Sequence, residues 1–190
     1  MNVENPAGPR CPEPAGPFAR PARTVVDQAA AGERCEWLLQ RTLDAVRPAL
    51  SWRYAAPRAG ARLPPPGSGP ADGGVQWYVG RGRDIVTIIS GARRGELPAM
   101  VEAGWRRRGW TITSVNACRE LPGVAAVTPD GYRLALEFGV LGEARLTATS
   151  PGVARSEPVR GAPGGPEVPY AVGGSAALPE IRCPFWSALG

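Results

Sequence analysis

The sequence predicts an α+β domain: an antiparallel sheet of four to five strands with two amphipathic helices on one face, in the order α-β-α-β-β-β. Three observations lead to this fold class. Apolar side chains recur at helical spacing in residues 24–46 and again in 95–109. Between 110 and 149 the apolar residues instead alternate with polar ones, as a half-buried strand requires. Prolines are rare in residues 75–150, which marks this stretch as the ordered body.

Proline and glycine divide the chain of 190 residues into three parts. Residues 1–23 are predicted to form a disordered, proline-rich N-terminus. Residues 24–153 are predicted to form one α+β domain with a flexible loop at 57–74. Residues 154–190 are predicted to form a mostly irregular tail, in which the apolar side chains at 181–186 are able to dock on the body.

The first helix is expected from about Thr24 to Val46. Thr24 is placed to cap it, and Asp27 faces its positive end. Pro48 ends it because proline cannot continue a helix. The stretch "SWRY" at 51–54 is a candidate short strand, and the proline-rich segment after it is a loop.

Two segments rich in β-branched and aromatic residues follow, "VQWYV" at 75–79 and "DIVTIIS" at 84–90. We expect the "GRGR" at 80–83 to break the chain between them. "GRGRD" superficially resembles a phosphate loop, but it lacks the spacing of such motifs, so a turn is the favoured interpretation. The second helix, 95–109, has Glu96 and Pro98 in its first turn, and Gly109 is placed to close it in a left-handed conformation.

After Gly109 the sequence predicts a meander of strands. "WTITSVNA", "GVAAVT", "YRLALEF" and "EARLTAT" are the strand segments, and Asp130-Gly131 is a strong hairpin signal. In "EARLTAT", Ala144, Leu146 and Ala148 fall on one face, and the opposite face carries Glu143, Arg145, Thr147 and Thr149. No nucleophile, acid pair or glycine cradle interrupts the alternation, so the pattern indicates a fold and not a reactive site.

The formal net charge of +5 comes entirely from arginine, because the chain has no lysine. One basic run lies beside aromatic residues, and it gives these candidate binding residues: Trp105, Arg106, Arg107, Arg108 and Trp110. As a binding site for nucleic acid or an anionic surface, the tryptophans would stack on bases. As structure, the arginines complement the negative end of the helix, which is the favoured interpretation.

Histidine is absent, which removes the general base of most acyl-transfer triads and the mixed zinc sites. The predicted elements bring no two carboxylates obviously together, and Cys118 has no histidine to act as its base. We therefore expect no catalytic residues, no metal site and no cofactor.

The four cysteines, Cys11, Cys35, Cys118 and Cys183, are far apart in the sequence, which argues against a zinc site. Disulfides in an exported protein and buried thiols both remain open, and the candidate disulfide residues are Cys35, Cys118 and Cys183. No stretch is long and apolar enough to be a transmembrane helix, and the N-terminus lacks the features of a signal peptide. If the start is as given, the expected location is the cytoplasm.

Residues 24–153 resemble a group of small secreted proteins or lipoproteins of actinobacteria, of the streptomycete type. The resemblance rests on a helix ending at "RP", the helix-to-strand passage "GWRRRGWTITSV", and "TPDGYRL" opening a meander that ends in "SP". It implies an extracytoplasmic protein, secreted or held in the cell envelope, and it supplies no catalytic residues. The group often has a cysteine after "SP", where this chain has Gly152.

These observations lead to a function hypothesis and an alternative. The hypothesis is a non-enzymatic extracytoplasmic or envelope-associated binding domain with an unknown partner, such as a cell-envelope component or a protein. The alternative is a binder of nucleic acid or an anionic surface through Arg106–Arg108, although nucleic acid is not the expected partner. An enzyme that uses carboxylates or Cys118 is the least favoured class.

Overall fold

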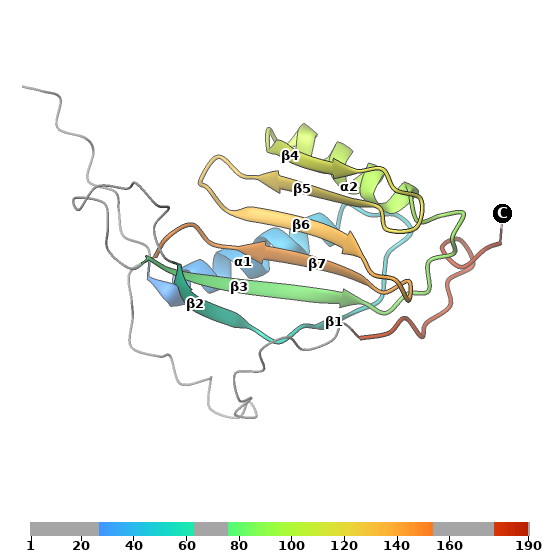
Figure 1. Cartoon of the computed structure of the whole chain (residues 1–190), viewed down its shortest axis with the longest axis horizontal. Coiled ribbons are helices and arrows are strands. Elements are labelled where there is room, and N and C mark those ends of the chain that lie inside the picture. Colours follow the sequence, from blue (N-terminus) through green and yellow to red (C-terminus); the bar gives the residue numbers. More distant parts are fainter. Residues whose placement is uncertain (1–26, 63–75, 154–176, 190) are drawn as a thin grey trace, which may run out of the picture.

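The protein forms two layers, a twisted antiparallel sheet and two helices that cover one of its faces (Figure 1). The computed structural model describes residues 27–62, 76–153 and 177–189. The predicted N-terminus at 1–23, most of the predicted loop and residues 154–176 of the tail lie outside the described residues. The α+β class, the antiparallel sheet and the two covering helices are confirmed.

The two helices are α1 (Gln28–Leu43) and α2 (Glu96–Arg107). The side chain of Asp27 caps α1, because its Oδ1 accepts a hydrogen bond of 2.7 Å from the Ala30 N–H. After α2, Gly109 has a φ of 73°, which is the left-handed conformation expected of it.

The sheet has more strands than the four to five predicted, and their order is also different. The described residues form α-β-β-β-α-β-β-β-β, with seven strands in one sheet. The strands are β1 (Trp52–Tyr54), β2 (Arg58–Arg62), β3 (Gln76–Ile85), β4 (Thr111–Asn116), β5 (Gly123–Val127), β6 (Arg133–Phe138) and β7 (Ala144–Thr149). They lie in the order β1-β3-β7-β6-β5-β4, and β2 also pairs with β3.

Two predictions about the first half of the sheet are wrong. The sequence predicts a loop after Tyr54, but residues 58–62 form β2, which pairs antiparallel with the first half of β3. It also predicts a break at the "GRGR" of residues 80–83, but β3 runs through this segment without interruption. Long strand β3 therefore pairs on one side with β1 and β2 in succession, and on the other with β7.

The core lies between the helices and one face of the sheet. Leu38 and Leu39 of α1 and Trp105 of α2 are fully buried there. The alternation predicted for the meander is confirmed, since the inward-facing residues of β6 and β7 are buried and those between them are not. Neither described helix lies on the other face of the sheet, as the view in Figure 1 shows, and we call it the open face.

The C-terminal segment, residues 177–189, lies against the end of β3 and the residues that follow it. Ile181 pairs with Thr87 in a parallel bridge, and the Trp186 side chain is fully buried, with its Nε1 donating a 2.8 Å hydrogen bond to the carbonyl of Pro48. These contacts tie the C-terminal segment to the residues after β3 and to the connection between α1 and β1.

Candidate functional site

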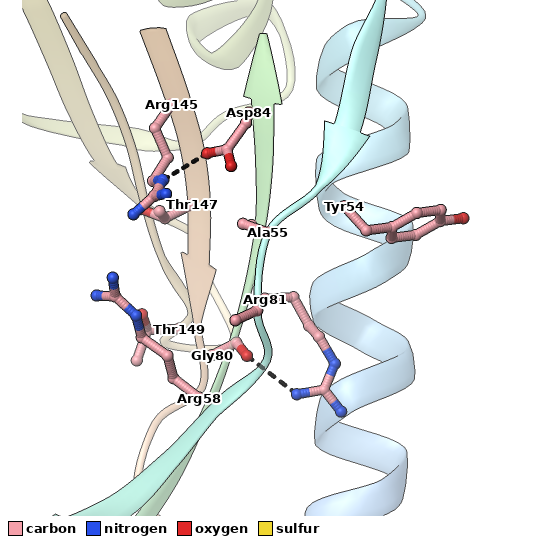
Figure 2. A pocket seen from close by; sticks show the side chains of 11 residues that line it. Tyr54, Ala55, Arg58, Gly80, Arg81, Asp84, Arg145, Thr147 and Thr149 are labelled. Atoms are coloured by element: carbon pink, nitrogen blue, oxygen red, sulfur yellow. Dashed lines mark hydrogen bonds and ion pairs between the residues drawn. The ribbon is translucent and has the colours of Figure 1, made fainter. Parts of the chain in front are cut away.

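A groove of about 170 Å³ lies on the open face, where β3 passes between β7 and the β1–β2 connection. Gly80 and Gly82 of β3 form its floor, because they lie opposite Thr149 and Thr147 in the sheet. The two threonines of β7 form one wall, and Figure 2 shows Thr149 beside Gly80 and Arg58. The connection from Ala55 to Arg58 forms the other wall. We call this the open-face groove.

The floor is low because the two glycines carry no side chain on the open face. In the register of the sheet, Gly80 lies opposite Thr149, and Gly82 lies opposite Thr147. A Cβ added at Gly80 would make ordinary contacts, the nearest at 3.5 Å to the Cβ of Arg58. A Cβ added at Gly82 would come within 3.1 Å of the Cβ of Ala55, which is tighter than ordinary contact, so the edge segment would have to move by a few tenths of an ångström. Of the two glycines, only Gly80 could carry a methyl group without a close contact, so the open space above it is not a consequence of tight packing.

Four charged residues line the groove, and the side chain of one of them, Arg81, is directed away from it toward α1. Arg145 is ion-paired with Asp84, with 2.6 Å between Nε and Oδ1, so these two charges offset one another. Arg58 is exposed and forms no hydrogen bond or ion pair within the part of the chain that the structure describes. Figure 2 shows its guanidinium on the same side of the sheet as that of Arg145, near Thr149. The described residues therefore give the groove a surplus of one positive charge.

A second uncompensated arginine lies farther along the same row of the sheet. Arg133 of β6 lies opposite Thr149, which lies opposite Gly80, which lies opposite Arg58. Arg133 is exposed and, like Arg58, has no ion-pair partner among the described residues. Three strand spacings of about 4.8 Å put the two Cα atoms about 14 Å apart. On the open face, two guanidinium groups without a described partner thus lie on either side of Gly80 and Thr149.

The other arginines of β3 point to the opposite face and serve packing. Arg81 and Arg83 face α1, where both contact the carboxylate of Glu36. Figure 2 shows the Arg81 side chain directed toward the helix and away from the groove. The "GRGR" segment thus alternates glycine on the open face with arginine on the helix face.

The aromatic part of the sequence-predicted site is not accessible. Trp105 is fully buried, with its Nε1 donating to Thr42 Oγ1 at 3.0 Å, and Trp110 is 8% exposed. The two rings lie side by side, with their centroids 6.1 Å apart, at the inner surface of α2. Neither tryptophan is placed to stack on a base.

The three arginines of that run are exposed, and two of them are engaged within the fold. Arg106 forms an ion pair of 2.7 Å with Glu102, and Arg108 donates to the carbonyls of Gly104 and Arg41. Arg107 has no hydrogen bond or ion pair within the described residues. The contacts of Arg106 and Arg108 are those expected of basic residues at a helix C-terminus.

The candidate disulfide is not formed among the described cysteines, since Cys35, Cys118 and Cys183 are free thiols. Cys35 is a buried residue of α1, Cys118 is exposed after β4, and Cys183 is half-buried in the C-terminal segment. The three described cysteines thus lie in different parts of the fold, each as a free thiol. Cys11 lies outside the described residues.

The sequence contains a partial signal for the open-face groove. The alternation in "EARLTAT" places Arg145, Thr147 and Thr149 on the solvent side of the sheet, and the structure confirms this. The alternation could not show that Arg58 reaches the same place, because Arg58 comes from a segment without a recognisable strand pattern. Nor could it show that Gly80 and Gly82 share one face, since that required β3 to be continuous.

Membrane spans and metal sites are not found in the part of the chain that the structure describes. No helix there has the length and apolar character to cross a membrane. No group of three or more histidine, cysteine, aspartate or glutamate residues there is placed to hold a metal ion.

Comparison with known proteins assigns no family. No family model matches the sequence, and no curated protein matches it. Among solved structures, a DUF4853 family protein from Actinomyces odontolyticus ATCC 17982 aligns with a TM-score of 0.43 and 12% sequence identity, over 86% of this chain and 82% of that chain. At that TM-score the likeness supports no conclusion about fold or function.

Proposed function

We propose that this chain is a non-enzymatic binding domain, and that its open-face groove binds an anionic group, a carboxylate or a phosphate. The observation that carries the proposal is the Arg58 guanidinium, which has no partner among the described residues, beside a floor that has no side chains at Gly80 and Gly82. Guanidinium groups bind both kinds of anion through two parallel hydrogen bonds.

The size of the groove supports a particular kind of partner. Its volume of about 170 Å³ is below the roughly 300–1,000 Å³ of pockets that enclose a small molecule. It has room for one anionic group of a larger partner, whose remainder would lie across the open face. Arg133, beyond Thr149, is placed to meet a second anionic group of the same partner.

Polar side chains at the groove are available to such a ligand. The Thr149 hydroxyl, which lies beside the floor at Gly80, forms no hydrogen bond within the described residues. The Thr147 hydroxyl makes only a long bond of 3.4 Å to the carbonyl of Ala135. Each can donate to an anion without breaking a strong contact.

The proposed setting is outside the cytoplasm, in the cell envelope or the medium. It rests on the resemblance of residues 24–153 to secreted actinobacterial proteins. Intact mass of the protein from fractions of its native host, with and without reduction and alkylation, tests this setting. A processed or lipid-bearing N-terminus in the envelope fraction supports it, and an unprocessed cytosolic chain contradicts it.

The binding site is tested by following backbone amide signals in an NMR titration with sodium phosphate and, separately, with sodium acetate. Sodium chloride at equal ionic strength is the control. We expect phosphate or acetate to shift the amide signals of four groove residues more than chloride does: Gly80, Gly82, Thr147 and Thr149. The anion that saturates these shifts at the lower concentration identifies the preferred group. Shifts no larger than those with chloride would contradict the proposal.

The second candidate is an anionic-surface or nucleic-acid binder through Arg106–Arg108. Arg107 is the residue that favours it, because its guanidinium is exposed and has no described partner. This candidate predicts that a short duplex DNA shifts the amides at the end of α2, with an affinity that falls steeply as salt increases. Shifts confined to the open face would exclude it.

A further inference from the structure

The two edges of the sheet differ in a way that bears on pairing with another strand. The edge formed by β1 and β2 is interrupted at residues 55–57, includes Pro57, and carries arginines at 53, 58 and 62. Proline and charge on an edge strand oppose pairing with a second sheet. The other edge, β4, has the sequence "TITSVN", with no charge and no proline. It pairs with β5 alone among the described strands.

A mainly apolar groove, whose lining also includes Glu102 and Arg119, lies alongside the exposed end of β4. Val115 faces the helix side of the sheet, yet 52% of it is exposed. Next to it, a cavity of about 410 Å³ runs between the end of β4 and the first turns of α2, and its wall includes Pro98, Ala99 and Pro122. A strand added beside β4 would place its own helix-side residue over this groove.

We propose that a second copy of this chain pairs with β4, antiparallel and about a two-fold axis at Val115, so that two sheets join into one. With the axis there, Val115 lies directly opposite Val115 of the other copy, and Ser114 lies opposite Asn116 of the other copy. This register covers the exposed valine with a valine and opposes no like charges.

The local geometry of β4 favours that register over others. A bulge between Ile112 and Ser114 leaves Thr113 without a partner on β5 and turns the first half of this edge away from a second strand, while Ser114, Val115 and Asn116 pair regularly with β5. The axis at Val115 therefore falls within the regular part of the strand. Ala99, which is exposed and lines the same groove, is a small residue at the point where the two α2 helices would approach.

The contact is small, since each copy contributes one short strand and the flank of one helix. Interfaces of that extent are weak. The proposal therefore predicts a dimer that dissociates on dilution, which a covalent trap at the axis would capture.

The trap is a cysteine at the two-fold axis, in a background without Cys118, which is exposed, and without Cys11, which lies outside the described residues. In the full chain carrying Cys11→Ser and Cys118→Ser, Val115→Cys places two thiols opposite one another across the joined strands, at a spacing that a disulfide accepts. On mild oxidation, we expect this variant to form a covalent dimer several times faster than Val140→Cys does in the same background. Val140 is the matched control because it is a more exposed valine, at 79%, in the β6–β7 turn.

A second measurement uses the uncrosslinked protein. In sedimentation velocity over a dilution series, wild type and Val140→Lys should show a dimer that dissociates, whereas Val115→Lys should remain monomeric because two lysines would face one another at the axis. A wild-type monomer at every concentration, or equal crosslinking rates at positions 115 and 140, would overturn the proposal.

Discussion

Arg83 illustrates how a single residue organises the helix face of β3. Its side chain is 3% exposed, pairs with Glu36 of α1, and contacts the rings of Trp52 and Tyr54, with its Cζ 4.5 Å and 4.1 Å from their centroids. Its Nε has no hydrogen-bond partner within the described structure. The arginine is thus held by one carboxylate, the Gly82 carbonyl and two aromatic faces, and only the carboxylate offsets its charge, which makes it sensitive to loss of that carboxylate.

Replacing Glu36 by glutamine should therefore destabilise the fold. We expect a loss of about 2 kcal/mol in the free energy of unfolding, less than for a fully buried pair because Glu36 is 35% exposed. The double variant Glu36→Gln with Arg83→Met should recover part of this loss, because no unpaired charge stays buried. Urea unfolding of both single variants and the double variant measures the coupling, and additive effects would contradict it.

Among the described residues, Cys35 is the one whose ionisation is most strongly coupled to folding. Burial raises the pKa of its thiol from 9.0 to about 12, with Arg81 lowering it and Glu36 raising it by smaller amounts. Above pH 9 the unfolded chain loses this proton while the folded chain keeps it. The unfolded state then binds fewer protons, so the free energy of unfolding falls as pH rises.

We expect the free energy of unfolding to fall as pH rises above about 9. The slope should reach at most about 1.4 kcal/mol per pH unit, the value for one proton. Burial also raises the pKa of Tyr132 above 10.0, so the window from pH 9 to 10 isolates the thiol best. Urea unfolding across this window measures the slope, and Cys35→Ala should remove the Cys35 part of it. An unchanged slope in this variant would show that Cys35 does not cause it.

Strand β3 shows why some elements of the fold were not predictable. Glycine and arginine together indicate a turn, because glycine is a poor strand former and arginine is rarely buried beside a hydrophobic core. In the structure the same four residues obey the period of a strand, with glycine outward and arginine inward. The inward arginines are tolerated because Glu36, far away in the sequence, meets them. Helices and the later meander were predictable because their patterns are local.

The two glycines of β3 should respond differently to an added methyl group. Gly82→Ala forces a Cβ to within 3.1 Å of Ala55 and should destabilise the protein by about 1 kcal/mol or more. Gly80→Ala makes only ordinary contacts, so its free energy of unfolding should stay the same or rise slightly. Equal losses in thermal and urea unfolding would contradict the description of the groove floor.

Across the molecule as a whole, the C-terminal segment completes the core. The sequence could suggest docking from its aromatic residues, but not where they would dock, because the contacts join residues that lie far apart in the chain. Trp186 fills a site beneath Pro48, and the Ser90 N–H donates a 2.8 Å hydrogen bond to the Trp186 carbonyl. The segment therefore connects the end of the chain to the stretches on both sides of β3.

Truncating the Trp186 side chain tests how much the stability of the fold depends on the C-terminal segment. We expect Trp186→Ala to lower the free energy of unfolding by about 3–5 kcal/mol, because a fully buried indole leaves a large cavity. Leu189→Ala is the matched control, since Leu189 lies in the same segment and is 92% exposed. A loss at Trp186 no greater than at Leu189 would mean that the segment is not part of the core.

Binding by the molecule depends on which of its exposed arginines holds the anion, and we assign this role to Arg58 and not to the run at the end of α2. Calorimetry of inorganic phosphate binding to Arg58→Gln and to Arg107→Gln distinguishes the two sites. The variants are matched because both arginines are exposed without described partners, and losing either one lowers the net charge by the same amount. Thermal unfolding checks that both variants remain folded. We predict a loss of affinity of about tenfold for Arg58→Gln, the size of one charged hydrogen-bond contact, and wild-type affinity for Arg107→Gln. Equal affinities in the two variants, or a loss for Arg107→Gln alone, would show that the groove is not the anion site.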